Sequence, residues 1–155
     1  MTAPRHVLFT GGGSAGHVVP NLPLIEHFAA LGSTISYVGS KEGPEAQLVA
    51  PLPASFFAIR SGKLRRYWSW RNVADVLWIV VGICQAIVLI RRLRPSIVFS
   101  KGGYVAFPVV VGAWFWRVPI VAHESDLTPG LANRLSLPFV DAVCTNFAST
   151  TFSLG

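Results

Sequence analysis

Short apolar runs alternate along this chain with longer segments in which apolar residues recur every three or four positions. The apolar runs predict strands at residues 5–10, 34–39, 55–59, 96–100, 119–122 and 142–145. The spacing of Leu24, Ile25, Phe28 and Ala29 predicts a helix that ends at Gly32. Further helices are predicted over residues 44–50, 73–93 and 102–116.

The predicted strands are apolar throughout rather than polar at every second position. Strands of this kind are buried on both faces, which is typical of a parallel sheet covered by helices on each side. The alternation of strands and helices therefore predicts an α/β fold, with a Rossmann-like parallel sheet and helices on both faces. We expect the 155 residues to form one domain.

The composition excludes a disordered or collagen-like chain, because 52% of the residues are hydrophobic. Charged residues make up only 13%, against a usual share of about 25%. This excess of apolar residues indicates a surface that packs against another domain or against a membrane. The 13 Lys and Arg outnumber the seven Asp and Glu, so the net charge of +6 favours nucleic acid, acidic lipid or a phosphorylated substrate as partner.

Cys84 and Cys144 lie in apolar surroundings with no CxxC motif and no neighbouring histidine. We therefore expect buried thiols rather than a disulfide or a metal site. No apolar segment precedes the first glycines, so the sequence predicts no secretory signal and a cytoplasmic location.

The first glycine loop follows a predicted strand and precedes a predicted helix. Its sequence, Gly11-Gly12-Gly13-Ser14-Ala15-Gly16-His17, contains a GxGxxG pattern, which lets the main chain approach an anionic ligand. A dinucleotide site would need an acid at the end of the second strand, and that strand ends in Gly39-Ser40 with Glu42 as the next acid. An NAD site is therefore disfavoured, and a tight turn without a ligand is a further alternative.

His17 is the candidate base of this loop. At the positive end of a helix its ring is expected to stay neutral near pH 7, and a neutral imidazole can accept a proton from a hydroxyl group. The alternative is a histidine that caps the helix or packs against Pro20.

A second glycine pair, Gly102-Gly103, also lies between a strand and a helix, flanked by Lys101 and Tyr104. Lys101 either adds a charge for phosphate or is a solvated loop lysine. The carboxyl ends of parallel strands meet at one edge of the sheet, so both glycine loops are expected at the same crevice.

The fifth predicted strand leads to the same edge, where it ends in His123-Glu124-Ser125-Asp126. For Glu124 the alternative to a ligand contact is a structural cap on a neighbouring loop, and Asp126 is alternatively a turn residue.

The segment before the long helix mixes cations with aromatic side chains, including Arg65, Arg66, Tyr67, Trp68 and Trp70. These residue types favour the interface of an anionic membrane. They also suit single-stranded nucleic acid, but no RNA-binding motif accompanies them. The apolar run over residues 76–90 is shorter than the roughly 20 residues of a spanning helix. We predict a helix partly buried on the sheet, with an exposed apolar stripe that contacts the membrane surface; a fully buried helix and a transmembrane helix are alternatives.

Four separated blocks resemble the MurG family of UDP-N-acetylglucosamine transferases in peptidoglycan synthesis. The blocks are VLFTGGGSAGHVVPNLPLI (residues 7–25), SGKLRRYWSWRN (61–72), FSKGGYVAFPVVV (99–111) and HESDLTPGLANRL (123–135). The resemblance implies the N-terminal, acceptor-binding domain of a GT-B glycosyltransferase, with the donor-binding domain outside these 155 residues. It implies transfer of N-acetylglucosamine from UDP to the muramoyl 4-hydroxyl of a lipid-linked pentapeptide acceptor (lipid I), with inversion and no metal or other cofactor.

The resemblance also implies roles for individual residues. His17 is expected to deprotonate the acceptor hydroxyl, and the loop of Gly13, Ser14, Ala15 and Gly16 to approach the donor sugar and the acceptor diphosphate. Lys101, Gly102, Gly103 and Tyr104 are expected to complete the diphosphate site. Glu124, Ser125 and Asp126 are expected to face the transferred sugar, and the basic aromatic segment to lie on the cytoplasmic face of the membrane.

Two positions depart from the family pattern, and two other functions remain open. Ser14 replaces the usual Thr and keeps the hydroxyl, whereas Asp126 replaces an Asn of some members and loses the amide donor. One alternative is a non-catalytic subunit that docks a separate donor-binding chain on the membrane. The other is the NAD(P)-binding domain of an oxidoreductase.

Overall fold

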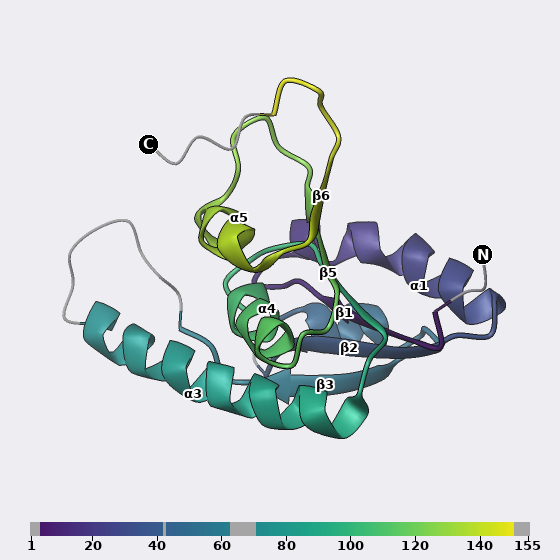
Figure 1. The fold of residues 1–155 in the computed structure, drawn as a ribbon, viewed down its shortest axis with the longest axis horizontal. Helices are drawn as coiled ribbons and strands as arrows, with labels where there is room; N and C mark the ends of the chain where they lie inside the picture. Colours follow the sequence, from purple (N-terminus) through teal and green to yellow (C-terminus); the bar gives the residue numbers. More distant parts are fainter. Residues whose placement is uncertain (1–3, 42, 63–70, 151–155) are drawn as a thin grey trace.

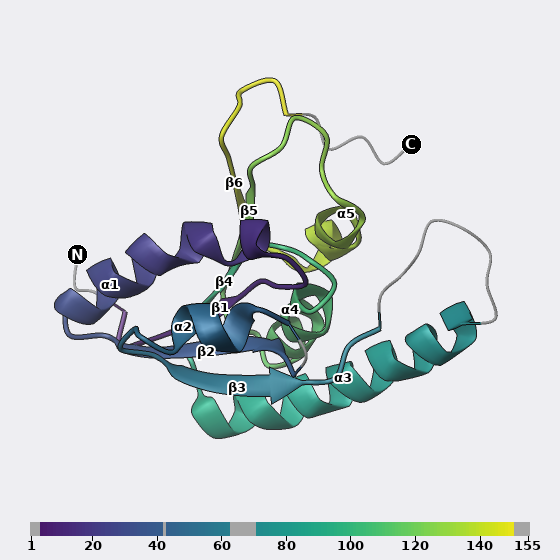
Figure 2. The same ribbon diagram turned by 180° about the vertical axis from the view of Figure 1, so that it is seen from behind.

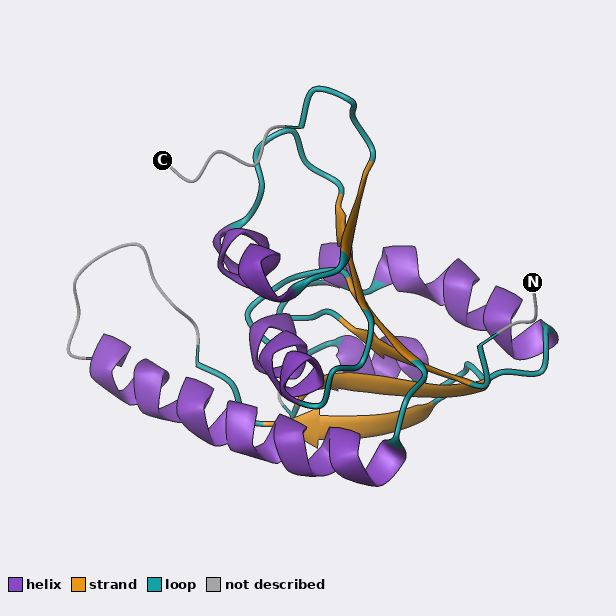
Figure 3. Ribbon diagram, in the orientation of Figure 1, coloured by secondary structure: helices purple, strands orange, loops and turns teal. Residues whose placement is uncertain are grey.

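The computed structural model describes residues 4–41, 43–62 and 71–150 and contains one six-stranded parallel sheet (Figures 1 and 3). The strands are β1 (His6–Thr10), β2 (Thr34–Ser40), β3 (Ser55–Ile59), β4 (Ile97–Ser100), β5 (Ile120–Glu124) and β6 (Ala142–Thr145), in the order β3-β2-β1-β4-β5-β6. All six predicted strands are confirmed, and so is the α/β class. Strand β5 ends two residues later than predicted, because His123 and Glu124 pair with Cys144 and Thr145 of β6.

Helices cover both faces of the sheet, as predicted. Figure 2 shows α1 (Leu22–Ala30) and α2 (Glu45–Val49) on the face opposite α3 (Arg71–Leu93) and α4 (Ala106–Phe115). Helix α5 (Leu131–Ser136) packs against α4, and short 3-10 turns occupy Ala15–His17, Val19–Asn21 and Leu137–Phe139. The sequence did not predict α5 or the 3-10 turns, because segments of three to six residues are too short to show a helical period.

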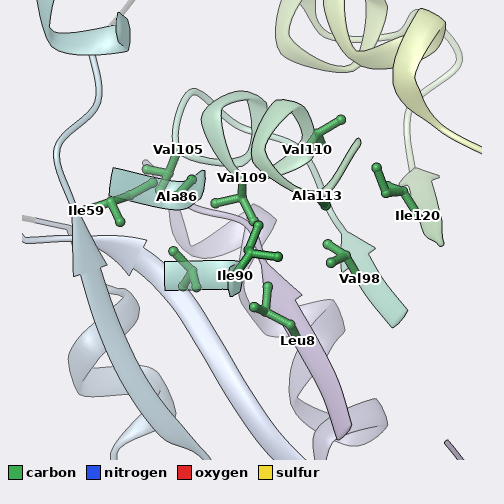
Figure 4. Close-up of a cluster of buried hydrophobic side chains, with 11 residues drawn as sticks. Leu8, Ile59, Ala86, Ile90, Val98, Val105, Val109, Val110, Ala113 and Ile120 are labelled. Carbon is green, nitrogen blue, oxygen red and sulfur yellow. The ribbon is translucent and has the colours of Figure 1, made fainter. Parts of the chain in front are cut away.

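The core explains why the strands are apolar at every position. Leu8 of β1 points to the α3–α4 side, where it packs with Ile90 and Val109 (Figure 4). Its neighbours Val7 and Phe9 point to the opposite side, where they join a second cluster under α1 and α2. Successive side chains of a strand point to opposite faces, so a sheet with two covered faces needs apolar residues without alternation.

Helix α3 is buried along one face only. Ala86 and Ile90 are 1% exposed and pack against α4 and the sheet, whereas Leu77 and Val88 are 63% and 69% exposed. The stretch Asp75–Leu93 is long and apolar enough to cross a membrane, yet its inner face is part of the domain core. The predicted partly buried helix with an exposed apolar stripe is confirmed, and a fully buried helix is excluded.

The prediction of two buried thiols was wrong, because both Cys84 and Cys144 are exposed. Cys84 lies on α3, whose outer side is open to solvent. Cys144 lies on the edge strand β6, in which all four residues are exposed. An apolar sequence around a cysteine therefore did not indicate burial here, since the exposed parts of α3 and β6 are themselves apolar.

The two-sided packing leads to a test with matched valines. Replacing the fully buried Val109 with alanine removes two methyl groups from the α3–α4 side of the core and leaves a cavity. We expect Val109→Ala to lower the free energy of unfolding by about 2 kcal/mol or more in urea titrations. Val88→Ala, at a 69% exposed helical position, should change it by no more than about 0.5 kcal/mol. Equal losses from the two variants would contradict this packing.

Candidate active site

Strands β1 and β4 are neighbours at the centre of the sheet. From β1 the chain continues outward to β2 and β3 on one side, and from β4 to β5 and β6 on the other, so the loops after β1 and β4 diverge and leave a crevice between them. Ligands of such sheets bind outside the carboxyl ends of the strands at this point. The loops that follow β1 and β4 are hydrogen-bonded to each other: Lys101 N–H donates to the Thr10 carbonyl at 2.9 Å and Gly12 N–H to the Gly102 carbonyl at 3.3 Å. The two glycine loops therefore meet at one rim, as predicted.

Two glycines allow this close approach. Gly103 has a φ of +86°, and a Cβ atom there would collide with the main-chain oxygen of Gly12. Gly13 has a φ of +89°, and a Cβ atom there would collide with the ring of Tyr104. Because side chains are disfavoured at these φ values and there is no space for them, the glycines are required for loop packing as well as for any ligand.

Glu45 supports the first loop from below and was missed at the sequence level. Its carboxylate is fully buried and accepts hydrogen bonds from Gly13 N–H at 2.6 Å and from Ser40 Oγ at 3.1 Å. The available signal was an acidic residue in the first turn of the short helix after the second strand. A negative charge there is stabilised by the positive end of the helix. The presence of Glu45 in this turn therefore does not by itself indicate contact with a distant loop.

A cavity of about 210 Å³ opens at the rim where the two glycine loops meet the end of β5. Five of the predicted site residues line it, namely His17, Gly103, Tyr104, Glu124 and Asp126. Other lining residues come from α3, α4 and α5 and include Ile79, Phe107, Leu131 and Leu135. Ser14, Ala15 and Gly16 are exposed in the loop that leads to His17. The strand ends and loops thus contribute the charged groups of the cavity, and the helices contribute mainly apolar side chains together with Asn133 of α5.

His17 combines partial burial with a nearby positive charge. Burial lowers the pKa of its imidazole, and the charge of Lys101 lowers it further; the main chain of Lys101 and the carboxylates of Glu124 and Asp126 act in the opposite direction. The net shift is downward, which agrees with the predicted neutral ring. The predicted cause was wrong, because α1 begins at Leu22 and His17 ends a 3-10 turn instead of opening a helix.

Lys101 lies beneath the rim with an exposed fraction of 1%. Its Nζ donates a hydrogen bond to Ser125 Oγ at 3.0 Å, which links the second loop to the end of β5. Burial lowers the pKa of this ammonium group, and the charges of Glu124 and Asp126 partly counteract the shift. The alternative of a solvated loop lysine is therefore excluded.

Glu124 caps a neighbouring loop, which was the structural alternative to a ligand contact. Its carboxylate accepts hydrogen bonds from Asp126 N–H at 3.0 Å, Gly130 N–H at 3.1 Å and Asn133 Nδ2 at 2.9 Å. Burial raises the pKa of Glu124, but these donors and the charge of Lys101 reverse the shift, so the carboxylate stays ionised. The sequence did not single out Gly130 or Asn133, although both belong to the block 123–135 and follow the proline of a turn.

The remaining predicted residues lie elsewhere. His123 points to the face of the sheet that α1 and α2 cover. Its ring lies near Phe99, and its Nε2 forms a hydrogen bond with Asn146 Oδ1 at 2.9 Å. The predicted membrane residues Arg65, Arg66, Tyr67, Trp68 and Trp70 lie outside the described residues.

Five buried polar atoms in the described part of the chain have no hydrogen-bond partner, and four of them lie around the crevice. These four are His17 Nδ1, Asn21 Oδ1, Ser100 Oγ and Asn133 Oδ1; the fifth is Ser61 Oγ, after β3. Buried polar groups normally have partners, and exceptions are concentrated where a ligand or water completes the site. This clustering marks the same rim as the cavity does.

Residues 7–145 match the glycosyltransferase family 28 N-terminal domain. The chain therefore belongs to this glycosyltransferase family. It is 55% identical over 141 residues to the UDP-N-acetylglucosamine–N-acetylmuramyl-(pentapeptide) pyrophosphoryl-undecaprenol N-acetylglucosamine transferase of Legionella pneumophila (strain Lens), covering 91% of the chain and 39% of that protein. It is 47% identical over 146 residues to the enzyme of the same name from Clostridium tetani, covering 94% of the chain and 41% of that protein. The family 28 domain thus spans about two fifths of these curated relatives.

The fold of the family 28 domain matches solved structures. The crystal structure of Acinetobacter baumannii MurG superposes with a TM-score of 0.81 at 24% identity, over 96% of this chain and 43% of that one. The resemblance to the MurG family noted from the four sequence blocks is confirmed, together with the Rossmann-like fold.

The contact between the two loops can be tested with two glycines of similar φ. Gly32 has a φ of +83°, and a Cβ atom added there would meet nothing within 4 Å, so Gly32→Ala should cost only the left-handed strain of about 1–2 kcal/mol. Gly103→Ala adds the collision with Gly12, and we expect a further loss of roughly 1–3 kcal/mol in the free energy of unfolding. Thermal and urea unfolding would measure both; a Gly103 variant as stable as the Gly32 variant would show that the loops are not in close contact.

Proposed function

We propose that this chain is the acceptor-binding half of an inverting N-acetylglucosaminyltransferase that converts lipid I to lipid II. The observation that carries the proposal is a partly buried histidine that lines a cavity beside two glycine loops, in a member of a glycosyltransferase family; burial lowers the pKa of this histidine. The name of the relatives at up to 55% identity specifies the same donor, the same lipid-linked acceptor and the same transferred sugar.

In the proposed reaction His17 accepts the proton of the muramoyl 4-hydroxyl. The hydroxyl oxygen forms a bond with the anomeric carbon of N-acetylglucosamine, and the bond from that carbon to the UDP oxygen breaks. The electron pair leaves with the UDP, and attack from the opposite side inverts the anomeric centre.

The glycine loops supply hydrogen-bond donors for the acceptor diphosphate. The amide groups of Ser14, Ala15 and Gly16 donate to no acceptor in the described residues, and all three residues are exposed. The main chain at Gly102 and Gly103 contacts Gly12 of the same loop. Main-chain amides in glycine loops bind phosphate oxygens without adding a charge that would need its own partner. We also propose that Lys101 and Tyr104, which flank Gly102 and Gly103, belong to this diphosphate site.

The end of β5 lies where the transferred sugar would be held. The carboxylate of Glu124 uses three of about four acceptor positions for its own loop, so one remains for a sugar hydroxyl. Asp126 is exposed and accepts from a hydroxyl in the same way, and Ser125 is held by Lys101. No metal ion or other cofactor is required in this proposal.

A donor-binding domain is expected to close the cavity, on this polypeptide or on another. The curated relatives are more than twice as long as the chain, which is consistent with a second domain that holds UDP-N-acetylglucosamine. The docking-subunit alternative differs in one respect, because such a subunit would not need His17. Membership of a glycosyltransferase family disfavours the oxidoreductase alternative.

The base assignment is tested by replacing His17 in a chain joined to a donor-binding domain, with lipid I and UDP-N-acetylglucosamine as substrates. We expect His17→Ala to reduce the rate of transfer about 10²-fold or more. His27→Ala, at an exposed position of α1, should retain the rate. The wild-type rate should fall on the acidic side only below the ordinary imidazole pKa of 6.5, because burial and Lys101 lower the pKa of the base. An unaltered rate in the His17 variant would favour the docking subunit.

We also propose that the outer face of α3 docks on the cytoplasmic leaflet. Val76, Leu77, Val80 and Val88 are between 49% and 69% exposed on α3, and Trp114, Phe115 and Trp116 at the end of α4 are 40–56% exposed. Trp116 lies beside the end of α3, since its Nε1 donates to the Ile87 carbonyl and the Arg91 guanidinium lies 5.1 Å from its ring centroid. Apolar side chains, tryptophans and arginines on one surface suit an interface of anionic lipid.

Docking is tested with two exposed leucines on opposite layers. Leu77 lies on α3 and Leu31 follows α1 on the other face of the sheet, and they are 63% and 54% exposed. We expect Leu77→Ser to weaken binding to phosphatidylglycerol vesicles roughly tenfold in sedimentation assays, because a leucine buried in lipid contributes about 1.5–3 kcal/mol. Leu31→Ser should bind normally, and added salt should weaken binding of every variant. Similar effects of the two leucines, or no binding at low salt, would contradict docking through α3.

A further inference from the structure

We infer that Lys101 is a positioning residue that holds His17 in its neutral, proton-accepting form. The inference rests on the proposed function, since it concerns the base of that reaction. It differs from the assignment of Lys101 as a phosphate ligand, because it gives the buried ammonium group a role toward a protein side chain.

The main chain places Lys101 directly under the turn that bears His17. The Lys101 amide is held by the Thr10 carbonyl at 2.9 Å. Gly11 lies between Lys101 and the turn that bears His17. A Cβ atom at Gly11 would touch the carbonyl oxygen of His17 and would lie 3.0 Å from Cβ of Lys101. The lysine side chain and the histidine turn are therefore packed against the same glycine.

The side chain of Lys101 is fixed within the protein. It is 1% exposed, so its charge is little screened by solvent, and Nζ is held by Ser125 Oγ at 3.0 Å. A neutral hydroxyl does not neutralise an ammonium group. Burial of such a charge is unfavourable for folding, and the nearby carboxylates of Glu124 and Asp126 offset this effect only in part. A positive charge in this position is consistent with an electrostatic role at the rim.

Three charged groups face His17 from the elements around it. Lys101 follows β4, and Glu124 and Asp126 lie at the end of β5. Lys101 has the largest effect of the three, and it disfavours the imidazolium ion. The opposing carboxylates are weaker, because Glu124 is engaged by three donors and Asp126 is exposed. Burial of His17 lowers its pKa most and acts in the same direction as the Lys101 charge, whereas the main chain of Lys101 acts in the opposite direction.

Titration of His17 in the 155-residue chain tests the inference without any substrate. The imidazole signals of the four histidines can be followed by NMR from about pH 5 to about pH 8 and assigned with single His→Gln variants. We expect Lys101→Met to raise the pKa of His17. Lys41→Met, which removes the same charge from an exposed position, should leave that pKa unchanged.

A further variant separates charge from packing. Ser125→Ala removes the hydrogen bond of Nζ but keeps the positive charge, so the His17 pKa should stay close to the wild-type value. An unchanged pKa in Lys101→Met, or an equal rise in Ser125→Ala, would overturn the inference. If Lys101→Met does not fold, Lys101→Gln removes the charge while its amide can still bond with Ser125, and the same outcomes apply.

For catalysis, the inference predicts that loss of the Lys101 charge shifts the pH dependence of kcat/KM, and does not lower the rate equally at every pH. With a donor-binding domain joined to the chain, Lys101→Met should move the acidic limb of kcat/KM to higher pH, and the rate below that limb should fall about tenfold per pH unit. A loss that is the same at every pH would indicate a structural role for Lys101. Absence of transfer by the wild-type protein would contradict the proposed function, whereas the NMR titration would still decide the role of Lys101.

Discussion

The structure depends on the close approach of two main-chain loops at the centre of the sheet. After β1 and β4 the chain passes through Gly12 and Gly103, whose backbones are in contact because neither carries a side chain. Hydrogen bonds between the loops, and the buried carboxylate of Glu45 under Gly13, hold this arrangement from both sides. His17 and Tyr104 follow the two loops directly, so their positions at the cavity are a consequence of that contact.

The groups at the rim are arranged so that the proposed base favours its uncharged form while its neighbour Glu124 is charged. Hydrogen bonds keep Glu124 ionised in spite of burial, while burial and Lys101 keep His17 neutral. An ionised carboxylate with one acceptor position still open can bind a hydroxyl group, whereas an uncharged imidazole can accept a proton. One strand end and one loop thus provide two chemically different groups about a single cavity.

The apolar excess of the sequence has a structural explanation in α3. Its inner face completes the core around Ile90, while its outer face carries exposed Leu77 and Val88. The outer face continues to Trp116 at the end of α4. The apolar wall of the cavity includes Ile79 of the same helix, so the proposed site for a lipid-linked acceptor and the proposed membrane surface share one element.

Local sequence was sufficient to predict the strands, the long helix, the glycine loops and His17, because buried strands and strand–turn–helix motifs leave a pattern within a few residues. Glu45, Gly130 and Asn133 could not be found in this way, since their roles come from contacts with residues far away in the chain. The burial of Lys101 and the exposure of Cys84 were likewise decided by which neighbouring elements pack over them. Residue type and spacing determined which groups reach the rim; only the tertiary structure decided their exposure and charge, because desolvation and Coulomb interactions depend on distances across the fold.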